Sequence, residues 1–141
     1  MFDSKEIRVA RTVGFFREQP SVWGIEQESS IHDLVRPTGE ADEAQIITYL
    51  ANGIDIFSQM GAEPDVLSAE NFPIAGGASL KTDGDWVWRL DLPHYVDAYH
   101  VALPQEFLRN VRAHNYVVPQ LEQDTLFSIL EEVTGIDYRK Q

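Results

Sequence analysis

Apolar and polar residues alternate most clearly between residues 78 and 90 of the chain. An apolar residue at every second position is typical of a β-strand with one face toward the core. The pattern predicts two strands, at residues 78–82 and 85–90. Asp83 and Gly84 stand between them, and an Asp-Gly pair favours the tight turn of a β-hairpin. Trp86 and Trp88 share one face of the second strand, so we expect both indole rings to lie in the core.

A helical period follows this hairpin directly. Apolar residues three or four positions apart lie on one side of an α-helix. Four such residues predict a helix after Asp91: Leu92, Tyr95, Val96 and Tyr99. Because Pro93 has no amide hydrogen, we expect the carboxylate of Asp91 to cap this helix by accepting a hydrogen bond from the backbone of His94.

Two more helices are predicted towards the end of the chain. Pro104 favours the first turn of a helix, since that turn needs no amide hydrogen at this position. The residues expected to face inward from this helix are Phe107, Leu108 and Val111. The last helix has its apolar positions at Leu126, Ile129, Leu130 and Val133. Asp124 is its expected N-cap and Gly135 its expected end.

The start of the chain has a weaker pattern. Residues 3–18 are predicted to form a helix with apolar residues near one face, and Pro20 stands just past its end. Residues 21–39 contain apolar residues that follow no clear period. We therefore assign no element there.

Residues 40–52 predict a further helix, with acidic residues in its first turn and Asn52-Gly53 at its end. Its expected inward stripe is Ala44, Ile47 and Ala51, with Leu50 beside it. A short strand is expected at residues 54–58. Residues 61–77 are expected to form a long loop because they contain Pro64, Pro73 and Gly76-Gly77.

Together these elements predict an α+β fold: a mostly helical single domain, residues 1–141, with a small antiparallel β-sheet. A chain of 141 residues is long enough to bury one hydrophobic core. Its 43% content of hydrophobic residues is typical of a globular protein. The sequence shows no internal repeat and no linker rich in Gly, Pro and Ser, so we place no domain boundary.

The charge of the chain is strongly negative and uneven. The formal net charge is −12, and residues 19–79 hold ten acidic side chains against Arg36 alone, a net of −9. Such a field repels nucleic acid and anionic membranes and speeds encounter with a basic protein. An acidic surface can also serve solubility alone, and charge by itself selects no partner.

The sequence also indicates where the protein works. It has no cysteine, which excludes disulfides and fits a reducing compartment. The start of the chain mixes charges and lacks the apolar core of a signal peptide. No apolar run approaches the roughly 18 residues of a transmembrane helix. We therefore expect a cytoplasmic protein that binds neither membrane nor nucleic acid directly.

A cluster of potential metal ligands recurs every three residues: Asp91, His94, Asp97 and His100. Three residues turn a helix by about 60° less than a full rotation, so the four side chains drift around the helix and at most two or three could converge. We expect capping and solvation to explain these residues, and we expect no metal ion and no other cofactor.

Catalytic motifs are weak. The serines lack the Gly-x-Ser-x-Gly context of a strained nucleophile turn. Residues 76–79, Gly-Gly-Ala-Ser, precede a strand and lack the Lys-Ser/Thr end of a phosphate-binding loop, so we expect a turn there. His32, Asp33 and His114 lie apart in the sequence without a candidate nucleophile. We expect no catalytic residues and a protein that is not an enzyme.

The segments TDGDWVWRLDLPHYVDAYHVALPQEFLRNVRAHNY and IITYLANGIDIF resemble immunity proteins of bacterial polymorphic-toxin systems, including those of contact-dependent growth inhibition. The matching features are the Thr-Asp-Gly lead, the Trp-x-Trp strand, the Tyr-Val-x-x-Tyr-His helix and the Leu-Pro-x-x-Phe helix start. This resemblance covers residues 44–116. It implies a single immunity-type domain that inhibits a toxin without catalysis, and it assigns no residue to the interface.

The leading hypothesis is an immunity protein that binds the C-terminal domain of a cognate toxin, expected to be a nuclease, and occludes its basic active-site cleft. The first alternative is an acidic adaptor or nucleic-acid mimic that binds another basic protein. The second is a small-molecule enzyme or ligand binder that uses the surroundings of His94. The candidate partner-binding residues are Glu26, Glu28, Asp33, Glu40, Asp42, Glu43 and Asp55.

Overall fold

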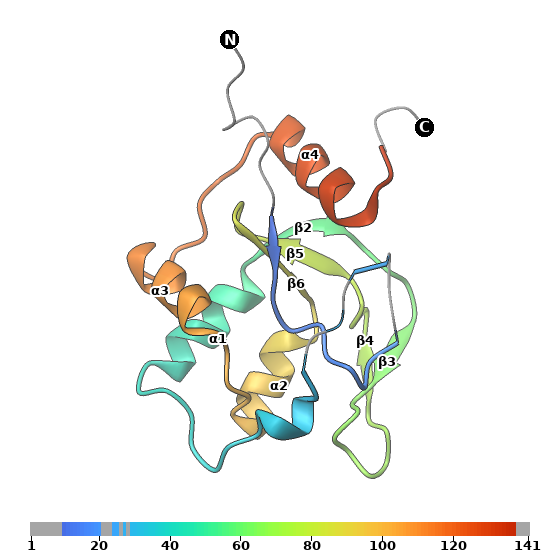
Figure 1. Ribbon diagram of the computed structural model, residues 1–141, viewed down its shortest axis with the longest axis vertical. Helices are drawn as coiled ribbons and strands as arrows, with labels where there is room; N and C mark the ends of the chain where they lie inside the picture. The colour runs from blue at the N-terminus through green and yellow to red at the C-terminus, as the bar shows by residue number, and fades with distance from the viewer. Residues whose placement is uncertain (1–9, 21–23, 26, 28, 138–141) are drawn as a thin grey trace.

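The computed structural model describes residues 10–20, 24–25, 27 and 29–137 of the chain. In this part the chain forms four α-helices and two small β-sheets (Figure 1). The helices are α1 (Glu43–Ala51), α2 (Leu92–Tyr99), α3 (Gln105–Ala113) and α4 (Gln123–Thr134), and a short 3-10 helix spans Ile31–Asp33. The predicted α+β class is confirmed, and more of the described residues lie in helices than in strands.

The larger sheet has four strands in the order β1-β6-β5-β2. These are β1 (Arg11–Thr12), β6 (Trp86–Arg89), β5 (Leu80–Thr82) and β2 (Ile54–Phe57). The hairpin of β5 and β6 and the strand β2 confirm the sequence predictions. The pairing of β1 with β6 is parallel, which makes the sheet mixed, where the sequence indicated antiparallel pairs alone.

The helix predicted at residues 3–18 is wrong over its described part, and residues 1–9 lie outside the described residues. From residue 10 the chain is extended, and the amide of Val13 donates to the carbonyl of Val87 at 3.0 Å. Gly14 has a φ of +82°, and a Cβ there would lie 2.8 Å from the side chain of Leu92. Backbone bonds to β6 and a glycine in a left-handed conformation outweigh the weak helical pattern.

The loop predicted at residues 61–77 is wrong as well. It contains β3 (Ala62–Pro64) and β4 (Pro73–Ala75), which pair antiparallel in a separate two-stranded sheet. We call this pair the β3–β4 ribbon. The amide of Asp65 donates to the carbonyl of Phe72 at 2.8 Å and continues the pairing towards the turn. Pro64 and Pro73 favoured a loop over strands in the sequence analysis, since proline is tolerated only at sheet edges.

Helix α1 lies where it was predicted, but it buries a different side. Its buried residues are Ile46, Tyr49 and Leu50. Ala44 and Ala51 are exposed, so the expected stripe is wrong by about one position. Tyr49 decides the difference, because its ring reaches Trp88 and Phe107 in the core.

The inward faces of α2 and α3 agree with the sequence. Leu92, Tyr95 and Val96 are buried on α2, and α3 buries the three residues expected. Asp91 stands at the N-cap position of α2 as expected. Its side chain makes no capping hydrogen bond, because its carboxylate binds the guanidinium of Arg89 in a bidentate pair at 2.9 and 3.1 Å.

Helix α4 ends at Gly135 as expected, with a φ of +77° at this residue. Its N-cap is Glu122, and Asp124 lies in the first turn instead of at the cap. Ile129 and Leu130 are buried against the sheet, while Leu126 and Val133 are half-buried.

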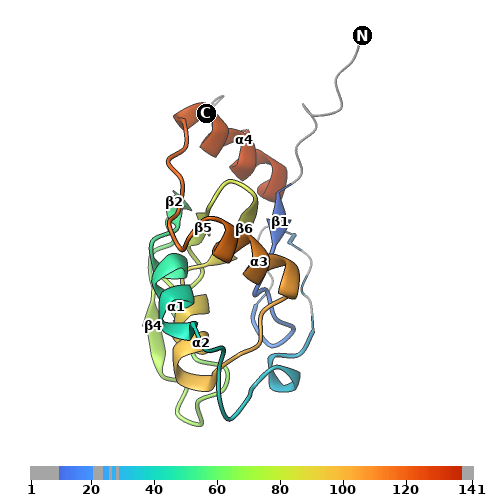
Figure 2. The same ribbon diagram turned by 90° about the vertical axis from the view of Figure 1, so that its left-hand side faces the viewer.

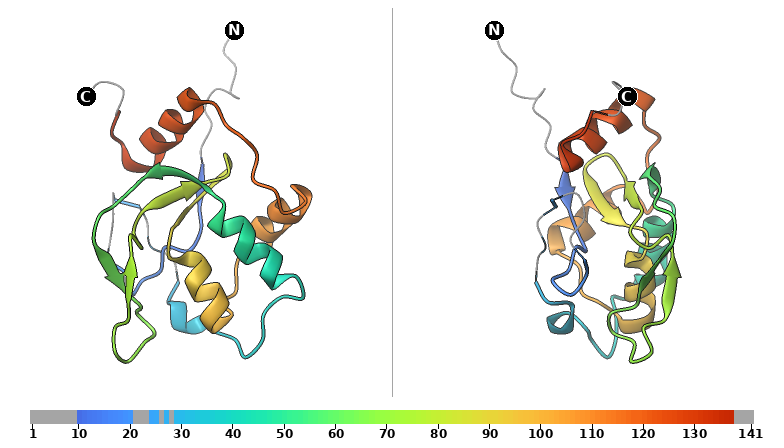
Figure 3. Two further views of the ribbon diagram at one scale, coloured as in Figure 1. Left: turned by 180° about the vertical axis from the view of Figure 1, so that it is seen from behind. Right: turned by 90° about the vertical axis from the view of Figure 1, so that its right-hand side faces the viewer.

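Two apolar clusters cover opposite faces of the larger sheet. The first joins Trp86 and Trp88 of β6 to α1, α2 and α3, which confirms the core position of both indoles. The second joins Leu80 and Val87 to Phe15 and to α4. Figures 2 and 3 show β1 at one side of the molecule and the β3–β4 ribbon at the other. The ribbon therefore lies away from both the N-terminal strand and α4.

Candidate functional site

Three of the candidate partner-binding acids lie together at the start of α1, and each already has a partner within the chain. Arg112 of α3 binds Asp42 through two hydrogen bonds of 2.9 and 3.0 Å. Tyr116 donates to the same carboxylate at 2.6 Å. Glu40 accepts from Arg36 at 3.0 Å and from Arg112 at 3.2 Å. These bonds tie the segment before α1 to α3.

The bonds change the acidity of both carboxyl groups. The hydrogen bond from Arg112 is the main cause that lowers the pKa of Asp42 from 3.8 to about 2, and the bond from Tyr116 adds to it. The bond from Arg36 is the main cause that lowers the pKa of Glu40. Both carboxylates are therefore charged at neutral pH, but much of their charge is balanced by neighbouring arginines.

Glu43 is also engaged. Its carboxylate lies 2.9 Å from Nδ1 of His100, at the end of α2. His100 has a φ of +54°, and its carbonyl accepts from Nε of Arg36 at 2.8 Å. Glu43 thus helps to hold α1 against the end of α2.

The other candidate acids are scattered. Asp33 is exposed at the end of the 3-10 helix, and its side chain makes no ion pair or hydrogen bond with a described residue. Asp55 on β2 pairs with Lys81 at 2.9 Å, with 61% of its side chain exposed. Glu26 and Glu28 lie outside the described residues. The structure therefore brings Glu40, Asp42 and Glu43 together and leaves Asp33 and Asp55 apart from them.

Ion pairs engage most of the positive charge in the described part of the chain. Arg11 pairs with Glu106, and Arg89 with Asp91. Arg36, Lys81 and Arg112 pair with acids as described above. Arg17 and Arg109 form no ion pair with a described acid. Exposed acids whose side chains form no ion pair or hydrogen bond with a described residue outnumber these two: Asp33, Glu70, Asp97, Glu122 and Asp124. The surface therefore keeps a negative excess.

The four potential metal ligands of α2 have separate partners. Asp91 binds Arg89 and His100 binds Glu43, while Asp97 is exposed. His94 points to Asp65, with 2.7 Å between Nε2 and Oδ2. Within the residues that the structure describes, no three His, Asp or Glu side chains gather in a way that could hold a metal ion.

The partner of His94 is a buried carboxylate that the sequence reasoning missed. Asp65 is 2% exposed and lies at the turn of the β3–β4 ribbon. Besides His94, it accepts from the hydroxyl of Tyr99 at 2.9 Å and from the amides of Leu67 and Ser68 at 2.8 and 3.1 Å. Burial acts to raise the pKa of Asp65, but the bonds from His94, Leu67 and Tyr99 outweigh it and lower this pKa. Asp65 fastens the ribbon to α2.

Asp83 has the same function in the hairpin of β5 and β6. It is 1% exposed and accepts from the hydroxyl of Tyr49 at 2.6 Å and from the amide of Asn110 at 2.7 Å. Its other oxygen accepts from the backbone of Asp85 and Trp86 at 2.9 and 2.8 Å. Burial, and then the bond to Asp83, raises the pKa of Tyr49, so this phenol stays neutral.

The outward face of the β3–β4 ribbon is apolar and exposed. Ala62 lies opposite Ala75, and Pro64 lies opposite Pro73, and all four side chains are exposed. The intervening residues of the two strands point inward: Ile74 packs on the core, and Glu63 lies 3.9 Å from Arg89.

Two large exposed apolar side chains lie near the ribbon, Met60 at its open end and Phe72 at its turn, on the side that faces α2. Met60 is 93% exposed before β3, and Phe72 is 58% exposed before β4. The ring of Phe72 lies nearly parallel to the ring of His94, with 16° between the planes and 6.5 Å between the centroids. His94 is in turn held by Asp65, so Phe72 is supported while it remains exposed. Residues 61–77 contain prolines and were predicted to form a loop. No pattern in the sequence therefore indicated this surface.

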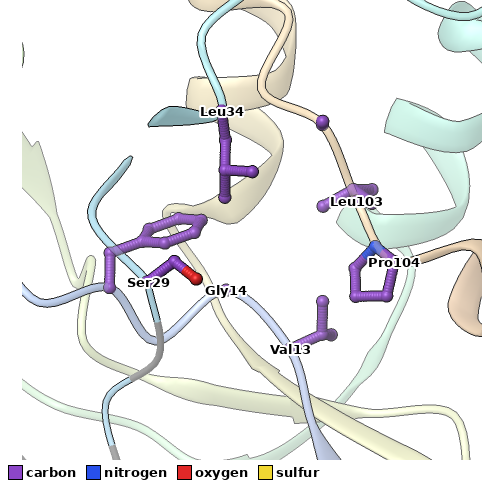
Figure 4. Close-up of a pocket in the computed structure, with 8 residues that line it drawn as sticks. Val13, Gly14, Ser29, Leu34, Leu103 and Pro104 are labelled. Atoms are coloured by element: carbon purple, nitrogen blue, oxygen red, sulfur yellow. The ribbon is translucent and has the colours of Figure 1, made fainter. Parts of the chain in front are cut away.

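A cavity of about 190 Å³ lies between the N-terminal extended segment and the connection from α2 to α3 (Figure 4). Its lining residues are Val13, Gly14, Phe16, Ser29, Leu34, Ala102, Leu103 and Pro104. The lining offers the hydroxyl of Ser29 and no titratable side chain. It is also smaller than the roughly 300 Å³ at which sites for small-molecule ligands begin. It therefore offers no catalytic group.

Comparisons with models of known protein families, with curated proteins and with solved structures find no match to this chain. In the described part of the chain, no helix combines the length and the apolar character needed to cross a membrane.

Proposed function

We propose that this chain is an immunity protein that binds and neutralises the C-terminal domain of a cognate toxin, a nuclease with a basic active-site cleft. The protein acts by occlusion and not by catalysis, needs no cofactor, and works in the cytoplasm of the cell that makes the toxin. The resemblance of residues 44–116 to immunity proteins motivates this proposal.

The observation that carries the proposal is the distribution of charge. Most arginines and lysines of the described part are engaged by carboxylates, while several exposed acids have no described partner. The field around the protein is therefore that of a −12 chain, and few of the cationic side chains in its described part are free of an ion pair. Such a field attracts a nuclease, whose cleft must be basic to bind phosphate.

Growth rescue tests the proposal directly. The probe is the C-terminal domain encoded by the gene immediately upstream of this one, expressed in a sensitive host. Expression of the domain alone should stop growth, and expression of this chain beside it should restore growth. The purified pair should form a one-to-one complex whose association rate falls as salt rises.

A matched control separates specific binding from unspecific charge attraction. An unrelated acidic protein of similar size and net charge should give no rescue. If the upstream-encoded domain does not bind this chain, or if it binds without loss of toxicity, the immunity function is wrong. Binding to other basic proteins alone would favour the adaptor or mimic alternative.

A further inference from the structure

We infer that a surface shared by the ribbon turn, residues 65–72, and helix α2 docks the basic partner protein; this inference rests on the proposed function. The surface consists of Phe72, His94, Asp97 and Ala98, and we call it the Phe72–Asp97 surface. Phe72 is the last residue of the ribbon turn, and the other three residues belong to α2. None of the acids named as candidates from the sequence belongs to it.

The four residues of this surface adjoin one another. The ring of Phe72 lies 6.5 Å from the ring of His94, with 16° between the planes. Asp97 and Ala98 follow His94 by three and four positions on α2, so they are its neighbours on the helix surface. Phe72, Asp97 and Ala98 are exposed, and His94 is half-buried. An aromatic ring and a carboxylate therefore share one solvent-facing surface.

The buried carboxylate of Asp65 holds the centre of this surface in place. It lies 2.7 Å from Nε2 of His94, and the ring of Tyr99 packs edge-on against the same imidazole. The backbone amide of Asp65 donates to the carbonyl of Phe72 at 2.8 Å. Asp65 thus fixes both the backbone of Phe72 and the ring beside it. An aromatic residue that is already positioned loses little conformational entropy on binding, which is typical of a hot-spot residue.

The charges of the two elements are acidic. The ribbon turn and α2 together contain Asp65, Glu70 and Asp97, and they contain no lysine or arginine. Asp65 is buried and pairs with His94. The side chains of Glu70 and Asp97 are exposed and form no ion pair or hydrogen bond with a described residue. Asp97 therefore places an unpaired negative charge directly beside the aromatic anchor.

Arg36 reaches the end of α2 from another element, but it is already engaged. Its Nε donates to the carbonyl of His100 at 2.8 Å, and its Nη1 binds Glu40 at 3.0 Å. It leaves the charge of Asp97 unpaired. The Phe72–Asp97 surface thus complements a protein surface that offers an apolar site for Phe72 and a lysine or arginine for Asp97.

The test measures affinity for the C-terminal domain encoded by the upstream gene. Phe72→Ala removes the ring and Asp97→Lys reverses the charge, and the melting temperature of each variant is measured alongside. We expect Phe72→Ala to weaken binding about 30-fold or more, as for a hot-spot residue. Asp97→Lys should weaken binding about tenfold at low salt and less at high salt, because it replaces an attraction by a repulsion that salt screens.

Two variants at other exposed sites are the matched controls. Glu122→Lys makes the same change of charge at the start of α4, which Figures 1 and 2 show at the opposite end of the molecule from α2. Val117→Ala shortens an apolar side chain at a 65% exposed site between α3 and α4. We expect neither control to lower affinity by more than about twofold, since a charge beyond a Debye length acts weakly.

A second measurement needs no substitution. Amide hydrogen exchange of the wild-type protein should slow in residues 65–72 and 92–99 when the upstream-encoded domain is added. Exchange in residues 123–134 of α4 should not change. This result would place the contact on the Phe72–Asp97 surface even if one of the variants folded poorly.

Four outcomes would overturn the inference. Wild-type binding that neither Phe72→Ala nor Asp97→Lys weakens, with no protection of residues 65–72 and 92–99, would leave the immunity function standing and move the interface elsewhere. An equal effect of Asp97→Lys and Glu122→Lys, or no effect of Asp97→Lys, would remove the local pairing with a basic occupant. A wild-type dimer that Phe72→Ala dissociates would assign the surface to a second copy. Absence of wild-type binding would overturn both this inference and the proposed function.

Discussion

A buried aspartate holds the turn of each of the two hairpins in this molecule. The two hairpins differ in how much of their strands is exposed. Asp83 in the β5–β6 hairpin and Asp65 in the β3–β4 ribbon each accept two backbone amides and two side-chain donors. In each case one donor is a tyrosine hydroxyl from a neighbouring helix, Tyr49 or Tyr99. A buried carboxylate with four donors is fully satisfied and holds its turn rigidly.

The strands on either side of these turns have opposite surroundings. All four residues of β6 are buried, because helices or apolar residues cover both faces of its sheet. In the ribbon only the middle residue of each strand is covered. The comparison teaches that an internal anchor can position a hairpin without making it part of the core, which leaves a rigid surface free for a partner.

The largest expected effect contrasts an aromatic residue of each hairpin. Trp88→Ala should lower the free energy of unfolding by about 3–5 kcal/mol, because a fully buried indole leaves a cavity. Phe72→Ala should cost less than about 1 kcal/mol, because most of its ring is exposed. Urea denaturation measures both values. Equal losses would show that the ribbon belongs to the core after all.

The anchors themselves can be compared next. Asp83→Ala should cost about 3 kcal/mol, since it leaves four buried donors without an acceptor in the centre of the fold. Asp65→Ala should cost less globally, about 1–2 kcal/mol, since the ribbon can open alone. Hydrogen exchange should then speed up selectively in residues 62–75. If exchange rises equally over the whole chain, the ribbon does not open as a separate unit.

Acid should weaken the hydrogen bonds that Asp65 and Asp42 accept. The folded-state pKa values of Asp65 and Asp42 lie below their ordinary value, and that of Asp42 is about 2. A lowered pKa means that these carboxylates stabilise the fold above about pH 4 and lose that contribution as pH falls through the folded value. Thermal melts from pH 5 to pH 2 should show the decline, and Asp42→Asn should flatten it. A melting temperature independent of pH in this range would contradict the prediction.

The smallest expected effect on stability is that of exposed acids without a described partner, in contrast to acids that an arginine binds. Glu70→Lys and Asp97→Lys should change the free energy of unfolding by no more than about 0.5 kcal/mol, because both side chains are exposed. They should slow association with the upstream-encoded domain at low salt. Asp42→Lys should instead destabilise the fold, since it places a cation beside Arg112. Stopped-flow association in a salt series and thermal melts distinguish the two classes.

Local patterns were reliable where one residue type decides the backbone. The hairpin turn after Thr82, the alternation through Trp86 and Trp88, and the stop at Gly135 appear as predicted. The centre of the turn is one residue later than predicted, at Gly84 and Asp85, because the amide of Asp83 donates to the carbonyl of Trp86. Each rests on a local preference that needs no distant partner. The α+β class follows from the sum of such signals.

Side-chain pairing was not predicted by the same reasoning. The carboxylate of Asp91 was expected to cap α2, but it forms a buried ion pair with Arg89, two residues earlier on β6. Glu40, Asp42 and Glu43 were expected to meet a partner, and Arg36, Arg112 and His100 meet them first. Charge counted along the chain does not tell which charges are paired in space.

By itself, the sequence determined the acidity of this protein, its class of fold and the core hairpin, because composition and short-range periodicity are properties of neighbouring residues. Only the tertiary structure decided that Arg11–Thr12 is a strand beside β6, that residues 62–75 form a ribbon, and that Asp65 and His94 support an exposed Phe72. The paired residues are 9 positions apart at the closest, Pro64 and Pro73 in the ribbon, and 75 positions apart at the farthest, Arg11 and Trp86. Such contacts form only when the whole chain has folded and buried its carboxylates against donors from other elements.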